Sequence, residues 1–208
     1  MPKTKAFDRY SDEYDNWFAK NPDKYEAELE LIRGLLPCRP DAAGIEIGVG
    51  SGKFAAPLGI KTGVEPSAQM AARAEEQGIK VISGIAENLP LPDESFDFVL
   101  MVTTLCFLDD VTGSLKEARR VLKNQGFLIV GFVDKNSELG RKYEANKEKS
   151  KFYRGASFLS SEDVLEYLKN TGFKPEIIKQ TLVPDKPDQA VLKGFGRGAF
   201  VGVRAVKA

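Results

Sequence analysis

The sequence predicts an α/β fold: a seven-stranded, mostly parallel sheet with helices on both faces, an antiparallel strand pair at one edge, and additional helices at the N-terminus. Two observations support this. Between residues 44 and 133, short apolar runs alternate with helical patterns, which is typical of a parallel sheet joined by crossover helices. The last third has one helical pattern followed by two strand-like runs. With no second long helix to cross the sheet, that strand pair is simplest to place as antiparallel.

The N-terminal segment, residues 6–36, is expected to form two helices that meet at Asn21 and Pro22, because proline is favoured in the first turn of a helix. Apolar residues recur at spacings of three and four in the second helix, which indicates that one of its faces is buried. These residues are Tyr25, Leu29, Ile32 and Leu36.

The central part is expected to hold five strands, several without polar alternation, as in central parallel strands that are buried on both faces. Helices are expected at 67–77 and 112–123, the second ended by Gly126. A further helix should begin after Ser160, as its N-cap, and end before Gly172. The five strands are expected at 44–47, 62–64, 80–82, 96–102 and 127–133, and the final pair at 176–183 and 199–206.

A glycine-rich loop follows the first expected strand and is predicted to open a helix. Its glycines, Gly48, Gly50 and Gly52, have the spacing G-x-G-x-G. A dinucleotide-binding loop would read G-x-G-x-x-G, but Lys53 occupies the position of its third glycine. Glu46 precedes the loop, and its carboxylate would repel a pyrophosphate but attract a cationic amino-acid group. The loop therefore argues against a nicotinamide-dependent oxidoreductase, which remains an alternative.

A second acidic residue, Glu65, lies 19 positions after Glu46, at the end of the second expected strand. A carboxylate at this position can accept hydrogen bonds from both hydroxyls of a ribose. Parallel strands end at the same edge of a sheet, so Glu65 and the glycine loop are expected to lie together, at an adenosine-containing cofactor.

An ordered set of motifs gives a more specific indication. Glu46-x-Gly-x-Gly-x-Gly is followed by Val-Glu65-Pro-Ser, by Ala86-Glu87-Asn-Leu-Pro, by Ser-Phe-Asp97-Phe-Val and by LKEARRVLKNQGFLIV at 115–130. This set resembles class I methyltransferases that use S-adenosylmethionine (SAM), and within them the small-molecule branch with the ubiquinone and menaquinone enzymes. The resemblance is strong over residues 43–133 and implies a Rossmann-like sheet, SAM as methyl donor and S-adenosylhomocysteine as product, without a metal.

The resemblance also implies which residues bind the cofactor. Glu46 and the glycine-loop backbone would hold the methionine part, Glu65 the ribose, and Ala86 and Glu87 the adenine. Ile85 departs from the family, which often has Asp there, so adenine recognition through that side chain is not implied. The complete implied set is Glu46, Gly48, Val49, Gly50, Glu65, Pro66, Ala86, Glu87 and Thr103.

The methyl acceptor is less determined by the sequence. Tyr10, Tyr14 and Trp17 form an aromatic cluster among acidic residues and are candidates to contact a substrate, for which a cationic amine would suit. Alternatively, this helix packs its aromatic face on the domain, or closes over the cofactor. Residues 135–158 are a second candidate lid. The chain has no histidine and no catalytic base stands out, while Cys106 is interpreted as a buried, small apolar residue.

Composition limits the remaining possibilities. Lys plus Arg and Asp plus Glu both number 30, so no net field would attract nucleic acid. The first 18 residues lack the apolar run of a signal peptide, and a cytoplasmic protein is expected. We expect one methyltransferase domain over 1–208, with a helical cap (1–40), a cofactor-binding core (41–135), and insertion helices with the last two strands (136–208). The expected function is methyl transfer to a small-molecule acceptor, without a nucleic-acid or membrane partner. A non-catalytic protein that binds SAM or S-adenosylhomocysteine is the alternative of another class.

Overall fold

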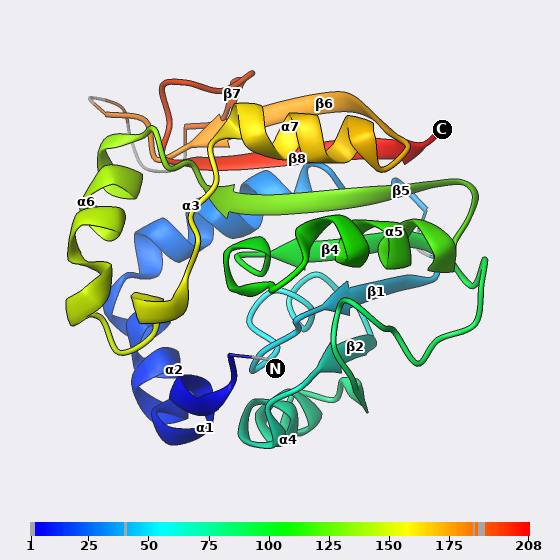
Figure 1. Ribbon diagram of the computed structural model, residues 1–208, viewed down its shortest axis with the longest axis horizontal. Coiled ribbons are helices and arrows are strands. Elements are labelled where there is room, and N and C mark those ends of the chain that lie inside the picture. The colour runs from blue at the N-terminus through cyan, green and yellow to red at the C-terminus, as the bar shows by residue number, and fades with distance from the viewer. Residues whose placement is uncertain (1–2, 40, 185, 187–189) are drawn as a thin grey trace.

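The computed structural model describes residues 3–39, 41–184, 186 and 190–208. In this part of the chain, eight strands form one sheet in the order β3-β2-β1-β4-β5-β8-β6-β7 (Figure 1). The first five in sequence run parallel, and β8, β6 and β7 are antiparallel to their neighbours. The strands are β1 (Gly44–Ile47), β2 (Thr62–Glu65), β3 (Lys80–Ser83), β4 (Phe96–Val102), β5 (Leu122–Val133), β6 (Phe173–Thr181), β7 (Leu192–Lys193) and β8 (Phe200–Lys207).

The Rossmann-like fold with an antiparallel edge is confirmed, but with eight strands instead of seven. The additional strand, β7, pairs with β6 through Lys179 and Lys193 and lies inside the segment that the sequence indicated as a loop. Two residues are too few to show an alternating pattern, so only pairing with β6 defines this strand. Residues 185 and 187–189 of the same segment lie outside the described part.

Helices cover both faces of the sheet, as predicted. In β4, Phe98 and Leu100 point to one face and Val99 and Met101 to the other. Helix α3 (Pro22–Arg33) and helix α4 (Ala68–Glu76) pack on the first face, and α5 (Val111–Val121) and α7 (Ser161–Asn170) on the second. Figure 1 shows α5 and α7 in front of the strands and α3 behind them. The side-chain period of two thus produces two apolar clusters around one sheet.

Several predicted helix ends are present. Ser160 caps α7 in a capping box with Asp163, and Gly172 follows the helix with a φ of +81°, in the left-handed region that favours glycine. The prediction for Gly126 was wrong. Helix α5 ends at Val121 and β5 begins at the next residue, so Gly126 lies within a strand.

The N-terminal segment forms three helices instead of two: α1 (Lys5–Arg9), α2 (Ser11–Lys20) and α3. The break at Pro22 is as predicted, and a second break occurs at Tyr10. Helices α1 and α2 lie at the end of the sheet where the parallel strands finish, as does α6 (Glu138–Asn146) (Figure 1). Among the described residues, no helix has the length and apolar character to cross a membrane.

The glycine loop after β1 does not open a regular helix, contrary to the prediction. Residues 50–59 form consecutive turns. Gly52 and Gly59 have φ values of +83° and +75°, outside the right-handed helical region, and Pro57 has no N–H to continue a helical hydrogen-bond ladder. The chain therefore returns to the sheet by a compact turn region, packed through Phe54 and Ala55.

Candidate functional site

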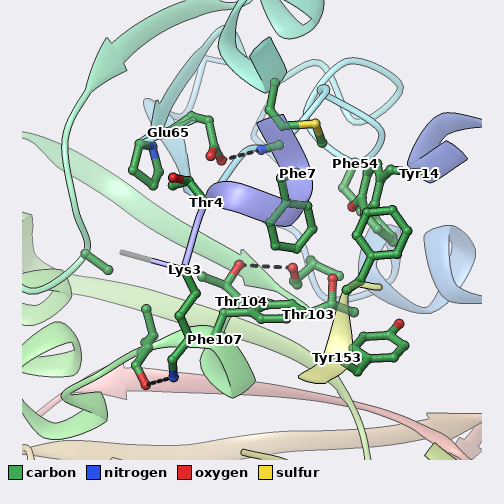
Figure 2. A pocket seen from close by; sticks show the side chains of 18 of the residues that line it. Lys3, Thr4, Phe7, Tyr14, Phe54, Glu65, Thr103, Thr104, Phe107 and Tyr153 are labelled. Carbon is green, nitrogen blue, oxygen red and sulfur yellow. Dashed lines mark hydrogen bonds between the residues drawn. The ribbon is translucent and has the colours of Figure 1, made fainter. Parts of the chain in front are cut away.

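A cavity of about 540 Å³ lies at the carboxyl ends of the parallel strands. The turns after β1, β2, β3 and β4, helices α1 to α3 and residues 143–153 form its wall (Figure 2). Nine of the residues singled out in the sequence line it: Gly48, Gly50, Glu65, Pro66, Ala86, Glu87, Thr103, Tyr14 and Trp17. The structure therefore brings the loop, the strand-end carboxylate and the aromatic helix to one space.

The glycine loop supplies backbone to the cavity wall. Gly48 and Gly50 have φ values of +73° and +54°, and the Gly48 N–H donates to the carbonyl of Val64 at 2.8 Å. A Cβ on Gly48 would lie 2.7 Å from the methyl carbon of Thr104. Both the conformation and the close approach of Thr104 therefore require glycine at this position.

Glu65 joins the loop to the end of β2 (Figure 2). Its Oε2 accepts a hydrogen bond from the Gly50 N–H at 2.9 Å, and its Oε1 accepts one from the Ser67 N–H at the same distance. Burial raises the pKa of this carboxyl, while the two N–H groups lower it. Each carboxylate oxygen has a second lone pair, so Glu65 holds the loop and can still accept hydrogen bonds from a ligand.

Glu46 and Val49 are not part of the cavity lining. Glu46 is 2% exposed, and the backbone N–H of Ala55 stabilises its charged form. Burial nevertheless raises the pKa of Glu46 well above its usual value, and its Oε2 has no hydrogen-bond partner in the described structure. Val49 packs against Gly63 of β2. Both residues pack beneath the glycine loop, on the face of the sheet that α3 covers, and so support the loop without lining the cavity.

Thr103, at the end of β4, has a φ of +51°, which is uncommon for a residue with a Cβ. Its N–H donates to the carbonyl of Gly131 at 2.7 Å, and this pairing with β5 holds the strained residue in the cavity wall. Such strain is concentrated at functional sites. Cys106 donates from its thiol to the carbonyl of Thr103 at 3.5 Å. Burial raises the pKa of Cys106 to about 12, so the thiol stays protonated near neutral pH and is not an activated nucleophile.

Residues 84–87 follow β3 and line the cavity near the N-terminus of the chain. Ile85 and Ala86 present apolar atoms there. The Glu87 carboxylate accepts a hydrogen bond from the Asp109 N–H at 3.0 Å, so it holds the loop after β4. Lys3 completes this end: its ammonium lies 3.4 Å from a carboxylate oxygen of Asp109.

Residues 5–20, the N-terminal lid, are attached to the glycine loop and to α4 by hydrogen bonds and ion pairs. Asp15 accepts a hydrogen bond from the Ser51 hydroxyl at 2.6 Å and pairs with Arg73 at 2.8 Å. Asp8 accepts a hydrogen bond from the Ser67 hydroxyl at 2.6 Å. Ser51 follows Gly50, and Ser67 is the second residue whose N–H donates to Glu65, so the position of the lid is coupled to the Glu65 end of the cavity.

The inner side of the N-terminal lid is aromatic. Phe7 lies across the cavity, with its ring centroid 5.1 Å from that of Phe107 and 5.5 Å from that of Phe152 (Figure 2). Tyr14 and Trp17 also line the cavity, as the sequence indicated. Tyr10 does not: its ring lies outside, 4.6 Å from the ammonium of Lys151.

Residues 135–158, the second lid, contribute the opposite aromatic wall. Tyr153 stacks on Phe107 at 6.1 Å and on Tyr143 at 5.1 Å. Lys151 pairs with Glu13 of the N-terminal lid at 2.7 Å, so the two lids meet above the cavity. The expectation that this segment lies over the site is thus supported by its contacts, although its charged residues face mainly outward.

Sequence reasoning missed two lining residues in particular: Glu28 and Phe54. Glu28 left a readable signal, because it shares the apolar stripe of α3 with Tyr25 and Leu29, and an acidic residue on such a stripe needs an explanation. Phe54 lies within the irregular turn region 50–59, where no periodic pattern indicates the direction of a side chain.

Comparison with known proteins agrees with this geometry. Residues 45–130 match the family described as a methyltransferase domain. A protein of unknown function from Methanocaldococcus jannaschii is 46% identical over 205 residues, which cover 97% of this chain and 98% of that protein. The 27-O-demethylrifamycin SV methyltransferase of Amycolatopsis mediterranei is 26% identical over 199 residues, covering 83% of this chain and 73% of the enzyme.

A solved structure is similar over nearly the whole chain. It is the crystal structure of a SAM-dependent methyltransferase of Thermotoga maritima, described as a possible histamine N-methyltransferase. The two proteins are 49% identical with a TM-score of 0.93, over 99% of this chain and 100% of that one. Taken with the glycine loop, the strand-end carboxylate and the strand order, these similarities mean that the chain belongs to the class I SAM-dependent methyltransferases.

Proposed function

We propose that this protein transfers a methyl group from SAM to a small-molecule acceptor inside the cavity. The observation that carries the proposal is Glu65. Its carboxylate lines the same space as the Gly48–Gly50 backbone, and both of its oxygens are already oriented by N–H groups of that turn and of Ser67. A preoriented acceptor pair at the end of the second strand suits a ribose diol.

The residues of the cavity fit SAM in chemical type. Glu65, next to Pro66, would bind the ribose. The cavity-lining backbone of Gly48 and Gly50 would bind the methionine part, and Thr103 would border it. Ile85 and Ala86 line the cavity with apolar atoms that would pack on adenine, with backbone groups to read its polar edge. Glu46 and Val49 would act from outside the lining, by supporting the loop.

SAM carries its methyl group on a sulfonium, so the reactive group comes with the cofactor. The residues of this chain then have to orient an acceptor and exclude water. The two lids suit this role, because Phe7, Phe152 and Tyr153 cover the cavity with aromatic rings, and Phe7 and Tyr153 pack on Phe107. An acceptor with a free lone pair, such as a neutral amine, needs no further activation.

A small acceptor is favoured over a polymer because the lids enclose the space. The cavity volume of about 540 Å³ falls within the range of about 300–1,000 Å³ that is usual for small-molecule sites. The descriptions of two similar proteins name small acceptors: one is a possible histamine N-methyltransferase, and the other is a 27-O-demethylrifamycin SV methyltransferase. The formal net charge of zero gives no support to a nucleic-acid substrate.

Calorimetric titration with SAM, S-adenosylhomocysteine and NADH tests the cofactor part of the proposal, with Glu65→Ala as the variant. We expect the two sulfur cofactors to bind, NADH not to bind, and the substitution to weaken binding of the sulfur cofactors. Absence of sulfur-cofactor binding by folded protein would overturn the proposal. Binding without methyl transfer to any amine, thiol, hydroxyl or carboxyl compound would favour the non-catalytic alternative.

A further inference from the structure

Glu28 is a buried carboxyl group in the cavity wall with no role in the proposed cofactor site. It lies on α3, is only 6% exposed and lines the cavity. Among the described residues, none forms a hydrogen bond or an ion pair with its carboxylate. Glu65 provides the contrast, because both of its oxygens accept backbone hydrogen bonds. Glu28 thus has its full hydrogen-bonding capacity available to a ligand.

In the described part of the chain, no cation pairs with the Glu28 carboxylate. Lys24, one turn earlier on the same helix, is exposed, and it is the one described cation whose field stabilises the charged form. Burial dominates and raises the pKa of Glu28 to about 8. A buried carboxyl without a partner lowers stability, so its placement in a cavity wall calls for a ligand that compensates for it.

Aromatic rings surround the space in front of Glu28. Tyr14 on α2, Tyr143 on α6 and Tyr153 in the second lid line the same cavity as Glu28. Burial is the main cause of the raised pKa of each of these phenols, and the negative charge of Glu28 adds to it. The same holds for Tyr25 on the helix of Glu28. Trp17 adds a further ring to this wall.

We propose that Glu28 and the rings of Tyr14, Trp17, Tyr143 and Tyr153 form a binding site for the ammonium group of the small amine that accepts the methyl group. Where this nitrogen is itself methylated, its proton passes to the Glu28 carboxylate, which leaves the neutral amine with the lone pair that the new N–C bond requires. A carboxylate provides charge-assisted hydrogen bonds to an ammonium, and aromatic faces attract the same cation. An anionic acceptor would be repelled, and a neutral alcohol would gain only ordinary hydrogen bonds. The inference rests on the proposed function, since it assigns the acceptor end of the same cavity.

Binding calorimetry on protein saturated with S-adenosylhomocysteine tests the proposal with two matched probe pairs. These are phenethylamine with 2-phenylethanol, and choline with 3,3-dimethylbutan-1-ol, in which the second compound lacks the positive charge. We expect each cation to bind roughly ten- to a hundredfold more tightly than its neutral partner. At pH 7, binding should also release protons, because a bound cation lowers the pKa of Glu28. Calorimetry in two buffers of different ionisation enthalpy measures this release.

Glu28→Gln keeps the size of the side chain and removes its charge. In this variant we expect the preference for the cation and the proton release to be lost, while S-adenosylhomocysteine and the neutral probes bind as before. Glu26→Gln is the control, because Glu26 is exposed on the same helix and should leave every affinity unchanged.

The proposal is overturned if neither cation binds, if each neutral compound binds as tightly as its charged partner, or if Glu28→Gln retains the preference. Its failure differs from failure of the proposed function. S-adenosylhomocysteine binding in the first step reports on the cofactor site alone, whatever the probes do afterwards.

Discussion

Glu65 combines two tasks in one carboxylate: it orders the glycine loop through Gly50 and offers its remaining lone pairs to the cavity. Glu65→Gln disturbs both tasks while keeping the size of the side chain. The amide nitrogen of glutamine would face one of the two N–H groups, so the loop loses an acceptor and the cavity loses the diol acceptor pair. We expect S-adenosylhomocysteine to bind about 10- to 100-fold more weakly, as measured by calorimetry. Wild-type affinity in a folded variant would contradict the assigned role.

Gly48 and Gly59 form a matched pair for the glycine loop, because their φ values are +73° and +75° but only Gly48 is crowded. A Cβ on Gly59 would meet nothing within 4 Å. In Gly59→Ala, only the strain of an alanine at positive φ should therefore lower the free energy of unfolding, by about 1–2 kcal/mol. Gly48→Ala should lower the free energy of unfolding by more than this, since Thr104 must also move, and it should abolish S-adenosylhomocysteine binding. Urea unfolding and calorimetry measure the two effects. Equal losses of stability would show that crowding at Gly48 is unimportant.

Glu28 gives a pH signature that needs no ligand. Its pKa is raised from 4.5 to about 8 by burial, so in this pH range the folded protein binds a proton that the unfolded chain has released. The group therefore lowers the free energy of unfolding progressively as pH rises from about 5 to about 8. Relative to Glu28→Gln, the wild type should lose on the order of 3 kcal/mol across this range. Denaturant unfolding at several pH values measures it, and parallel profiles would contradict it.

At the level of secondary structure elements, the sequence predicted those with a strong period or cap. The strands β1 and β4 have the predicted bounds, and α7 has its predicted capping residues, because burial on both faces and side-chain capping are local signals. The break between α1 and α2 and the short strand β7 depend on tertiary contacts. The turn region 50–59 differs from the predicted helix because three glycines, Gly50, Gly52 and Gly59, adopt positive φ values there.

The candidate site was predictable to the same extent. Glu65 and the glycines were found because the linear sequence indicates both where a strand ends and how the glycines are spaced. The roles of Glu28 and Phe54 depend on which side of an element faces the cavity, and this direction follows only from packing. Tyr10 shows the reverse error, since its helix neighbours line the cavity while its own ring contacts Lys151 outside.

The N-terminal lid should respond to the loss of its attachment at Asp15. Asp15→Asn removes the ion pairs to Arg73 and Lys53 while keeping a hydrogen-bond acceptor for Ser51. Partly exposed pairs contribute little individually, so we expect a three- to tenfold faster dissociation of S-adenosylhomocysteine, with faster amide exchange over residues 5–20. Glu30→Gln is the control, because its partner Arg33 lies on α3 and is half exposed. Unchanged exchange in Asp15→Asn would show that other contacts hold the lid.

In the whole molecule, the last third of the chain is built into the sheet and is not appended to it. Strand β8 lies between β5 and β6, so the C-terminal strand separates the parallel part from the antiparallel edge. Lys179 of β6 donates to the carbonyl of Gly34 after α3 at 3.0 Å, and Arg119 of α5 donates to the carbonyl of Gly172 at 3.3 Å. We therefore propose that the cap, the core and the C-terminal third unfold as one domain.

This continuity leads to a prediction for thermal unfolding. The cavity draws its wall from the N-terminal helices, the strand ends and the second lid, so a ligand bound there should stabilise all three segments together. With S-adenosylhomocysteine at 100 times its dissociation constant, the free energy of unfolding should rise by about 2.7 kcal/mol. For a chain of this size, that corresponds to an increase in Tm of roughly 5–10 °C. Differential scanning calorimetry should therefore show one transition that moves as a unit, with no shift from NADH and a reduced shift in Glu65→Ala. Two transitions, of which only one moves with the ligand, would mean that the cap or the C-terminal third folds independently of the cofactor-binding core.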